Sequence, residues 1–333
     1  VDSSLTAWLL KQTGADVFGI TMKTIPGSKC CSLNDLYDAK EVCKLLKIPH
    51  KFVNLRKRFE KEVIEYFIKE SCSGKNPNPC VPCNQLVKFG DLWEAAKKAG
   101  AEFMATGHYA IIEYDLCKKR YILKRPADIK KDQSYILSMI DHKLLSRLIM
   151  PIGVYTKEET RKMAKDVGLP VFDKAENQDL CFLHKTKGCF IEQWSGKKAK
   201  HGRIIDKKGN YLGVHRGLIH YTLGQRKGIG LKNKYYVIGL NLKKNELIVG
   251  VKNDLYTSSF YVERPNWVSI SKLEQKMKVE VIVRNKSKPQ TAYISPEGKK
   301  VKVKTVEPIW AVSKGQIAAF LKKDVVIGGG WIC

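Results

Sequence analysis

The sequence predicts an α/β N-terminal domain built on a parallel sheet, followed by a small β-rich central domain and a C-terminal β-barrel. In the first half, β-branched apolar runs alternate with stretches of helical spacing, which favours right-handed βαβ units. From about residue 196 the helical spacing fades, and short β-rich segments separated by turns replace it. We place the three domains at residues 1–190, 191–252 and 253–333.

The first half contains the elements of a parallel α/β sheet. We expect strands over 16–23, 50–55 and 102–106, and helices over 34–46, 58–72 and 89–99. Beyond them we expect a hairpin over 111–123 and a helix over 132–148, and the capping box at 156–159 begins a further helix that ends at Gly168. Because ligands of such sheets bind at the carboxyl ends of strands, Met22 and Gly107 stand where a ligand is expected.

The second half has the pattern of one small β-rich domain followed by a β-barrel. Its β-rich segments lie at 235–240, 246–251, 260–262, 279–283, 300–306 and 316–321, and turns are expected at 208–210 and 296–298.

The charge of the chain is strongly unbalanced. Sixty Lys and Arg face 33 Asp and Glu, a net charge of +27, and the excess is densest over 185–234, where 13 basic residues face two acids. This balance indicates a polyanionic partner, most often nucleic acid, although a lysine-rich genome would also raise the total.

No apolar stretch reaches the ~18–20 residues of a membrane span, and the chain does not open on a signal peptide. We therefore expect no membrane association and a cytoplasmic location. An organellar location stays open, because the chain begins at Val1 rather than at methionine.

Ten unevenly spaced cysteines suit a reducing compartment with a few working thiols. Cys80-Val81-Pro82-Cys83 lies in a loop rich in proline and asparagine and is compatible with a zinc ligand pair, a redox pair or a nucleophile with a neighbour. A zinc site would need a second pair of cysteine ligands. Cys30 and Cys31 follow one another directly in the sequence and are poorly shaped for that pair. Cys83 directly precedes a helix expected to begin near Asn84, which favours a reactive thiolate.

Other motifs allow two interpretations each. Cys181, after the polar segment 176–179, is by itself typical of a buried apolar residue and is of interest only as a partner for Cys83. Val1-Asp2-Ser3-Ser4 is either a helix start or part of a phosphate-binding loop. The polar segment 131–135 is either a cluster that caps a helix or a contact to phosphate. The basic, glycine-punctuated loop 221–228, with nearby His215, offers Arg226 and Lys227 to phosphate.

Together these segments resemble the bacterial and organellar tRNA-specific 2-thiouridylases. The resemblance spans nearly the whole chain and implies a Rossmann-like, PP-loop ATPase domain in front of the two β-rich units. Val1–Ser4 is similar to the tail of the PP-loop. The segments that carry it are 1–4, 19–22, 30–32, 78–84, 105–109, 131–135, 176–181, 215–230 and 311–316.

The resemblance implies an enzyme that exchanges the 2-oxygen of the tRNA wobble uridine for sulfur. ATP, with Mg²⁺, adenylates the oxygen and releases pyrophosphate, and a persulfide sulfur then displaces AMP. By resemblance Cys181 carries the persulfide, received from a sulfur-relay protein, Cys83 is the catalytic nucleophile, and a Cys83–Cys181 disulfide is the by-product. The expected substrates are tRNAs with Lys, Glu and Gln acceptors.

The same resemblance implies further site residues. Asp2, Ser3, Met22 and Gly107 would contact ATP, and Asn78, Pro79 and Cys80 would face the target base. The tRNA contacts would be His108, Lys131, Asp132, Gln133, Arg284, Asn285 and Gln316. Two positions depart from some relatives: Cys80 replaces an aspartate proposed to assist proton transfer, and Asn285 replaces an aromatic residue.

Three alternatives stay open at this stage. Cys80, Cys83 and Cys181 form a set that in related tRNA thiolases holds a [4Fe–4S] cluster with one open iron site. An ATP pyrophosphatase that makes amides of a small molecule would share the nucleotide loop without needing paired thiols or a basic barrel. A non-catalytic RNA-binding protein would need only the basic surface.

Overall fold

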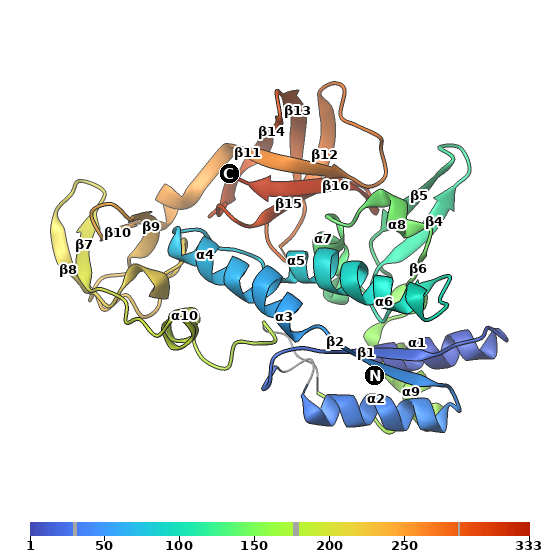
Figure 1. The fold of residues 1–333 in the computed structure, drawn as a ribbon. Coiled ribbons are helices and arrows are strands. Elements are labelled where there is room, and N and C mark those ends of the chain that lie inside the picture. The colour runs from blue at the N-terminus through green and yellow to red at the C-terminus, as the bar shows by residue number, and fades with distance from the viewer. Residues whose placement is uncertain (29–31, 176–179, 286) are drawn as a thin grey trace.

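The computed structural model describes residues 1–28, 32–175, 180–285 and 287–333 (Figure 1). The expected cysteine pair at 30–31 and the polar segment 176–179 lie outside this range. The N-terminal domain begins with α1 (Asp2–Gln12), β1 (Gly19–Lys23), α2 (Leu33–Leu45) and β2 (His50–Asn54). Strands β1 and β2 pair in parallel, from Gly19 opposite His50 to Lys23 opposite Asn54, which confirms a βαβ unit at the expected place.

Two long helices with π-helical central turns follow. The first is continuous through α3 (Arg56–Phe59), η1 (Glu60–Glu65) and α4 (Tyr66–Cys72), and the second through α5 (Cys80–Pro82), η2 (Cys83–Leu92) and α6 (Trp93–Lys98). Both expected starts of the second helix, at residue 89 and near Asn84, are wrong, because the helix begins at Cys80. Proline is tolerated in a first helical turn, where its missing N–H has no intrahelical partner, so Pro82 lies within the helix. Cys83 consequently lies in the first turn rather than ahead of the helix.

The rest of the N-terminal domain is made of short elements. These are β3 (Met104–Ala105), β4 (Ile111–Asp115), β5 (Arg120–Lys124), η3 (Ile129–Lys131), α7 (Ser134–Leu137), α8 (His142–Leu145), β6 (Leu148–Ile149), η4 (Pro151–Val154), α9 (Lys157–Asp166) and α10 (Lys187–Ser195). Strands β3 and β6 pair in parallel, β4 and β5 form the expected hairpin, and the Thr156–Glu159 capping box begins α9 as expected.

The expected helix over 132–148 is wrong. Helical hydrogen bonding stops after α7, because Asn266 of the barrel donates from Nδ2 to the carbonyl oxygens of Ser138 (2.9 Å) and Ile140 (2.8 Å). Asp141 then caps α8 by accepting from the Lys143 N–H at 3.0 Å. A tertiary contact from a residue far along the chain therefore divides a segment whose apolar spacing is helical.

The central domain is a four-stranded sheet in the order β8-β7-β10-β9. Its elements are β7 (Gly202–Asp206), β8 (Tyr211–His215), η5 (Leu218–His220), β9 (Tyr236–Asn241) and β10 (Glu246–Gly250). The expected turn at 208–210 joins β7 to β8. Ile204, Val237, Leu247 and Val249 form its small core.

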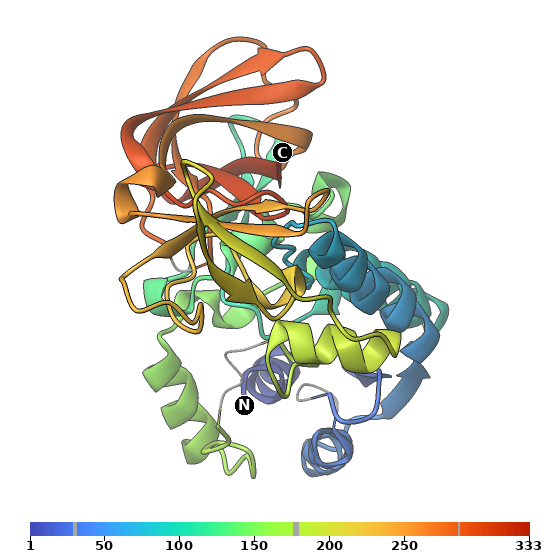
Figure 2. The same cartoon turned by 90° about the vertical axis from the view of Figure 1, so that its left-hand side faces the viewer.

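The C-terminal domain is a closed six-stranded barrel. After η6 (Lys252–Leu255) it consists of β11 (Tyr256–Trp267), β12 (Met277–Ile282), β13 (Gln290–Glu297), β14 (Lys300–Trp310), β15 (Ile317–Lys322) and β16 (Val325–Ile332). Pairing of β11 with β16 closes the barrel, and β16 also pairs with β5, with Val326 opposite Leu123. Figures 1 and 2 show the barrel on the side of the N-terminal domain opposite α1 and α2.

Within the described ranges no helix has the length and apolarity that a membrane span requires.

Candidate active site

Gly107 lies against the beginning of α1. A β-carbon on Gly107 would lie 2.6 Å from both the carbonyl carbon of Asp2 and the amide nitrogen of Ser3, so no side chain fits there. The first N–H groups of a helix have no intrahelical acceptor and carry the positive end of the helix dipole, which suits an anionic phosphate. Three of the residues expected to contact ATP are thus brought together. Gly107 follows the end of β3, and Asp2 and Ser3 lie at the start of α1.

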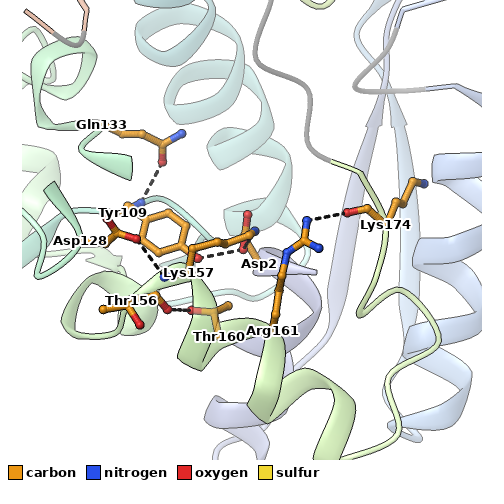
Figure 3. A network of polar contacts seen from close by, with 9 residues as sticks. All are labelled: Asp2, Tyr109, Asp128, Gln133, Thr156, Lys157, Thr160, Arg161 and Lys174. Carbon is orange, nitrogen blue, oxygen red and sulfur yellow. Dashed lines mark hydrogen bonds and ion pairs between the residues drawn. The ribbon is translucent and has the colours of Figure 1, made fainter. Parts of the chain in front are cut away.

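A polar network holds the Asp2 carboxylate (Figure 3). The Lys157 ammonium donates to Asp2 Oδ1 at 2.6 Å, and the Tyr109 hydroxyl donates to the same oxygen at 3.1 Å. Lys157 is only 7% exposed. Sequence reasoning placed Lys157 in a capping box and missed its contact with Asp2, because nothing in the local pattern links residues so far apart.

The network continues to Gln133. The side-chain oxygen Oε1 of Gln133 accepts from the Tyr109 backbone N–H at 2.8 Å, and the backbone N–H of Gln133 donates to the Tyr109 carbonyl at 3.1 Å. Asp132 accepts from the Arg125 guanidinium at 2.6 Å and from the Ser134 N–H at 2.8 Å. The contacts of Asp132 fit the capping interpretation of this segment, and those of Gln133 link it to the nucleotide side.

Cys83 lies in the first turn of its helix, where its N–H donates to the Pro79 carbonyl at 3.1 Å. Asn78 Oδ1 accepts from the Cys80 N–H at 3.1 Å, and Asn84 Nδ2 donates to the Cys80 carbonyl at 2.8 Å. Cys83 is 9% exposed and Cys80 is half-buried. The turn that carries both thiols is therefore held by its own asparagines.

Cys181 is half-buried and packs against the same apolar cluster that contains Cys83 and Met22. The neighbouring Phe182 anchors this segment, with its ring centroid 5.3 Å from that of Phe67 and 5.1 Å from that of Phe190. The two thiols, far apart in the sequence, thus lie on one core.

No single-ion metal site is found among the described residues. In the part of the chain that the structure describes, which includes Cys80, Cys83 and Cys181, no three His, Cys, Asp or Glu side chains are placed to hold a metal ion.

The residues expected to contact tRNA differ in exposure. His108 is 7% exposed and Nδ1 lies 2.9 Å from Thr106 Oγ1, while burial, aided by Lys88, lowers its pKa well below the ordinary value. His215 is also buried, and its Nδ1 accepts from the Gly217 N–H at 3.0 Å. Lys131 is half-buried, whereas Asn285, Arg226 and Lys227 are exposed.

Arg284 and Gln316 come from the barrel. The Arg284 guanidinium lies over the Trp310 ring at 4.9 Å and donates to the Ala311 carbonyl, and burial lowers its pKa. Arg284 and Trp310 line a cavity of about 350 Å³. Gln316 Nε2 donates to the Asn76 carbonyl at 2.7 Å, so it touches the loop that leads to Cys80.

Family models match the chain along almost its whole length. They are the tRNA methyl transferase HUP domain over residues 1–185, the tRNA methyl transferase PRC-barrel domain over 189–251 and the aminomethyltransferase beta-barrel domain over 257–332. A tRNA-specific 2-thiouridylase of Caldanaerobacter subterraneus subsp. tengcongensis is 44% identical, covering 100% of this chain and 95% of its own. Those of Thermoanaerobacter pseudethanolicus (43%) and Acetivibrio thermocellus (42%) cover 100% of this chain and 95% and 96% of their own.

Proposed function

Since the chain belongs to the family of tRNA-specific 2-thiouridylases, we propose that it is a tRNA-uridine 2-sulfurtransferase that exchanges the 2-oxygen of the wobble uridine for sulfur at the expense of ATP. Identity above 40% to curated relatives over the whole chain supports this proposal most directly. The geometry agrees: a helix start closed by Gly107 suits a nucleotide, and two thiols border one core.

The first step is adenylation of the uridine. Asp2, Ser3, Met22 and Gly107 would hold ATP, with the phosphates at the start of α1 and Mg²⁺ supplying positive charge to them. The 2-oxygen of the base attacks the α-phosphorus, and pyrophosphate leaves. The oxygen is now part of an AMP leaving group, which makes C2 of the uridine electrophilic.

The second step transfers sulfur. The terminal sulfur of a Cys181 persulfide attacks C2, and AMP leaves with the original oxygen. The Cys83 thiolate then attacks Cys181 Sγ, which releases the thiolated uridine and forms a Cys83–Cys181 disulfide. Alternatively, Cys83 attacks the persulfide first and releases sulfide, which attacks C2. Either route leaves the disulfide, which an external dithiol must reduce before the next turnover.

For the RNA we propose contacts on two sides of the thiols. Asn78, Pro79 and Cys80 would face the base. The remaining tRNA contacts would come from His108, Lys131, Asp132, Gln133, Arg284, Asn285 and Gln316. His108 and Asp132 are engaged within the protein, so their contacts would need a local rearrangement. The exposed Arg226 and Lys227 extend the basic surface over the central domain.

We propose that the division at 1–190, 191–252 and 253–333 corresponds to catalytic, central and RNA-binding units. We further propose a persulfide-carrying relay protein as sulfur donor, tRNAs with Lys, Glu and Gln acceptors as substrates, and the cytoplasm as the location.

Other reactions fit less well. The matched domain models carry the words methyl transferase and aminomethyltransferase, but the full-length relatives are 2-thiouridylases, and a methyl transfer would leave the two thiols unexplained. An amide synthase acting on a small molecule would likewise leave them without a role.

Mass spectrometry of tRNA nucleosides tests the proposal. The protein is incubated with unmodified tRNA, ATP, Mg²⁺ and a persulfide sulfur donor, with sulfide as the donor in a parallel reaction, and we expect 2-thiouridine only when ATP is present. A methylated uridine, or no modified nucleoside under any donor condition, would refute the assignment.

A further inference from the structure

We infer that the barrel holds the thiol-bearing loop in place, and that Gln316 and Tyr135 are positioning residues for sulfur transfer. The inference rests on the proposed function for its consequence, but its structural part does not depend on it. We call residues 76–83 the thiol loop and residues 313–316, which lead into β15, the clamp turn.

The clamp turn binds both backbone groups of Asn76, the first residue of the thiol loop. The Asn76 N–H donates to the Lys314 carbonyl at 2.8 Å, and the Asn76 carbonyl accepts from Gln316 Nε2 at 2.7 Å. These two bonds join segments about 240 residues apart in the chain. Each backbone group of Asn76 therefore has a partner in another domain.

The backbone of the clamp turn is shaped for this contact. Gly315 has φ +85°, a conformation that side chains disfavour, and a β-carbon there would lie 2.9 Å from Lys75 Cβ and 3.3 Å from the Asn76 nitrogen. A residue other than glycine would push the two segments apart.

Tyr135 of α7 sets the orientation of the Gln316 amide. Its hydroxyl has one hydrogen, which it shares between two acceptors, the Ile317 carbonyl at 2.9 Å and Gln316 Oε1 at 3.2 Å. Since Oε1 faces this hydroxyl, the amide nitrogen of Gln316 faces Asn76. Tyr135 is fully buried, so water does not compete for these bonds.

The thiol loop is stiff enough to pass this constraint to its cysteines. Pro77 and Pro79 fix two of its backbone φ angles, and Asn78 and Asn84 bind the backbone of Cys80. At the far side, Gln85 Nε2 donates to the Met139 carbonyl. The position of the barrel therefore sets the position of Cys80 and Cys83, and RNA bound to the barrel would act on the same loop.

Gln316 is also one of the proposed tRNA contacts, and thiol accessibility measured without RNA separates its positioning role from a role in RNA binding. We propose alkylation of the full-length protein by iodoacetamide in the absence of tRNA, with the rate at each cysteine measured by peptide mass spectrometry. The variants are Gln316→Glu, which cannot donate to Asn76, and Tyr135→Phe, which releases the amide. Lys314→Ala is the matched control, because it removes an exposed charge of the clamp turn but keeps the backbone carbonyl that accepts from Asn76.

We expect alkylation of Cys80 and Cys83 to rise roughly tenfold in Gln316→Glu, the equivalent of about one hydrogen bond, and to rise less in Tyr135→Phe. Lys314→Ala should match the parent protein. Alkylation of Cys43, which is buried and lies outside the thiol loop, reports global unfolding and should not change in any variant. If Gln316→Glu also raises alkylation of Cys43, the milder Tyr135→Phe decides.

In single-turnover thiolation at saturating tRNA, Gln316→Glu should slow sulfur transfer roughly tenfold, as loosening of one hydrogen bond would, while pyrophosphate formation, which reports adenylation, stays at the parent rate. Unchanged Cys83 alkylation in both variants, with only weaker tRNA binding, would overturn the inference. A protein that makes no 2-thiouridine would refute the proposed function but would leave the alkylation result valid.

Discussion

The backbone of Gly107 meets that of Asp2 with no room for a side chain, since a β-carbon on Gly107 would lie 2.6 Å from the Asp2 carbonyl carbon. Gly107→Ala should therefore displace the start of α1 and weaken ATP binding by at least about tenfold, or ~1.4 kcal/mol. Equilibrium dialysis with labelled ATP measures this. Gly239→Ala is the control, because its nearest neighbour would lie 3.4 Å away. Equal ATP affinity in both variants would contradict a nucleotide site at Gly107.

Lys157→Met should destabilise the protein. The buried ammonium donates to Asp2 Oδ1 at 2.6 Å, and its removal takes away the positively charged partner of that carboxylate. We expect the free energy of unfolding to fall by about 2 kcal/mol, as for hydrogen bonds between charged groups. Urea denaturation measures it. Lys272→Met, which breaks an exposed pair with Glu274, should change stability by less than about 0.5 kcal/mol. Similar losses in both variants would argue against a special role for Lys157.

Cys83→Ser should abolish sulfur transfer without weakening tRNA binding, because serine cannot exchange with a persulfide. Gel-shift titration gives the affinity and nucleoside mass spectrometry gives the product. Cys117→Ser, at an exposed thiol of the β4–β5 turn, should retain full activity. Residual thiolation by Cys83→Ser would exclude Cys83 as the nucleophile. Iron and sulfide bound by protein purified without oxygen, and absent from Cys80→Ala, would instead favour the cluster mechanism.

Binding of tRNA should weaken steeply with salt, because Lys and Arg release counterions from the RNA phosphates. Arg226 and Lys227 are exposed in the basic loop of the central domain. Replacing both with alanine should lower the slope of log affinity against log salt by about 0.7–0.9 for each phosphate that the variant no longer neutralises. Filter binding at several salt concentrations measures the slope. Salt-independent binding, or a slope unaffected by the double variant, would remove this loop from the interface.

Stability should fall with acidity because of His108. Burial lowers the pKa of His108 well below its ordinary value, so the folded protein keeps it neutral while the unfolded chain takes up a proton below about pH 6.5. The contribution of His108 to the free energy of unfolding is therefore fully present above that pH. As the pH falls below it, the free energy of unfolding declines by up to ~1.4 kcal/mol per pH unit. Urea unfolding at pH 7 and pH 5 measures it. His108→Gln should show a smaller decline, and an equal decline in both proteins would refute the assignment.

Local patterns predicted much of the N-terminal domain. The β1–α2–β2 unit and the capping box of α9 follow from apolar periodicity and from a side chain that bonds three residues away. The sequence also placed Gly107 where a ligand is expected, because the carboxyl end of a strand can be recognised locally, whereas for Asp2 local pattern left a helix start and a phosphate-binding loop both open.

Other elements could not be recognised locally. The three glycines of β16 are unfavourable for a strand in isolation, yet a β-carbon on Gly330 would lie 2.4 Å from Val262 Cγ1 and one on Gly329 would lie 2.6 Å from Ser138 Oγ. Close packing against neighbouring residues therefore requires glycine at these positions, although glycine has a low intrinsic propensity for strands. The break between α7 and α8 has a similar cause, since Asn266 takes the carbonyls that a continuous helix would use.

The sequence by itself determined the chemistry available to this protein: two reactive thiol candidates, a helix start suited to phosphate and a strongly basic surface. Only the tertiary structure decided which residues act together. Lys157 binds Asp2 across 155 residues and Gln316 binds Asn76 across 240. Periodicity and capping report forces within one or two turns of chain, whereas these pairs form only when the domains pack and bury their polar groups against each other.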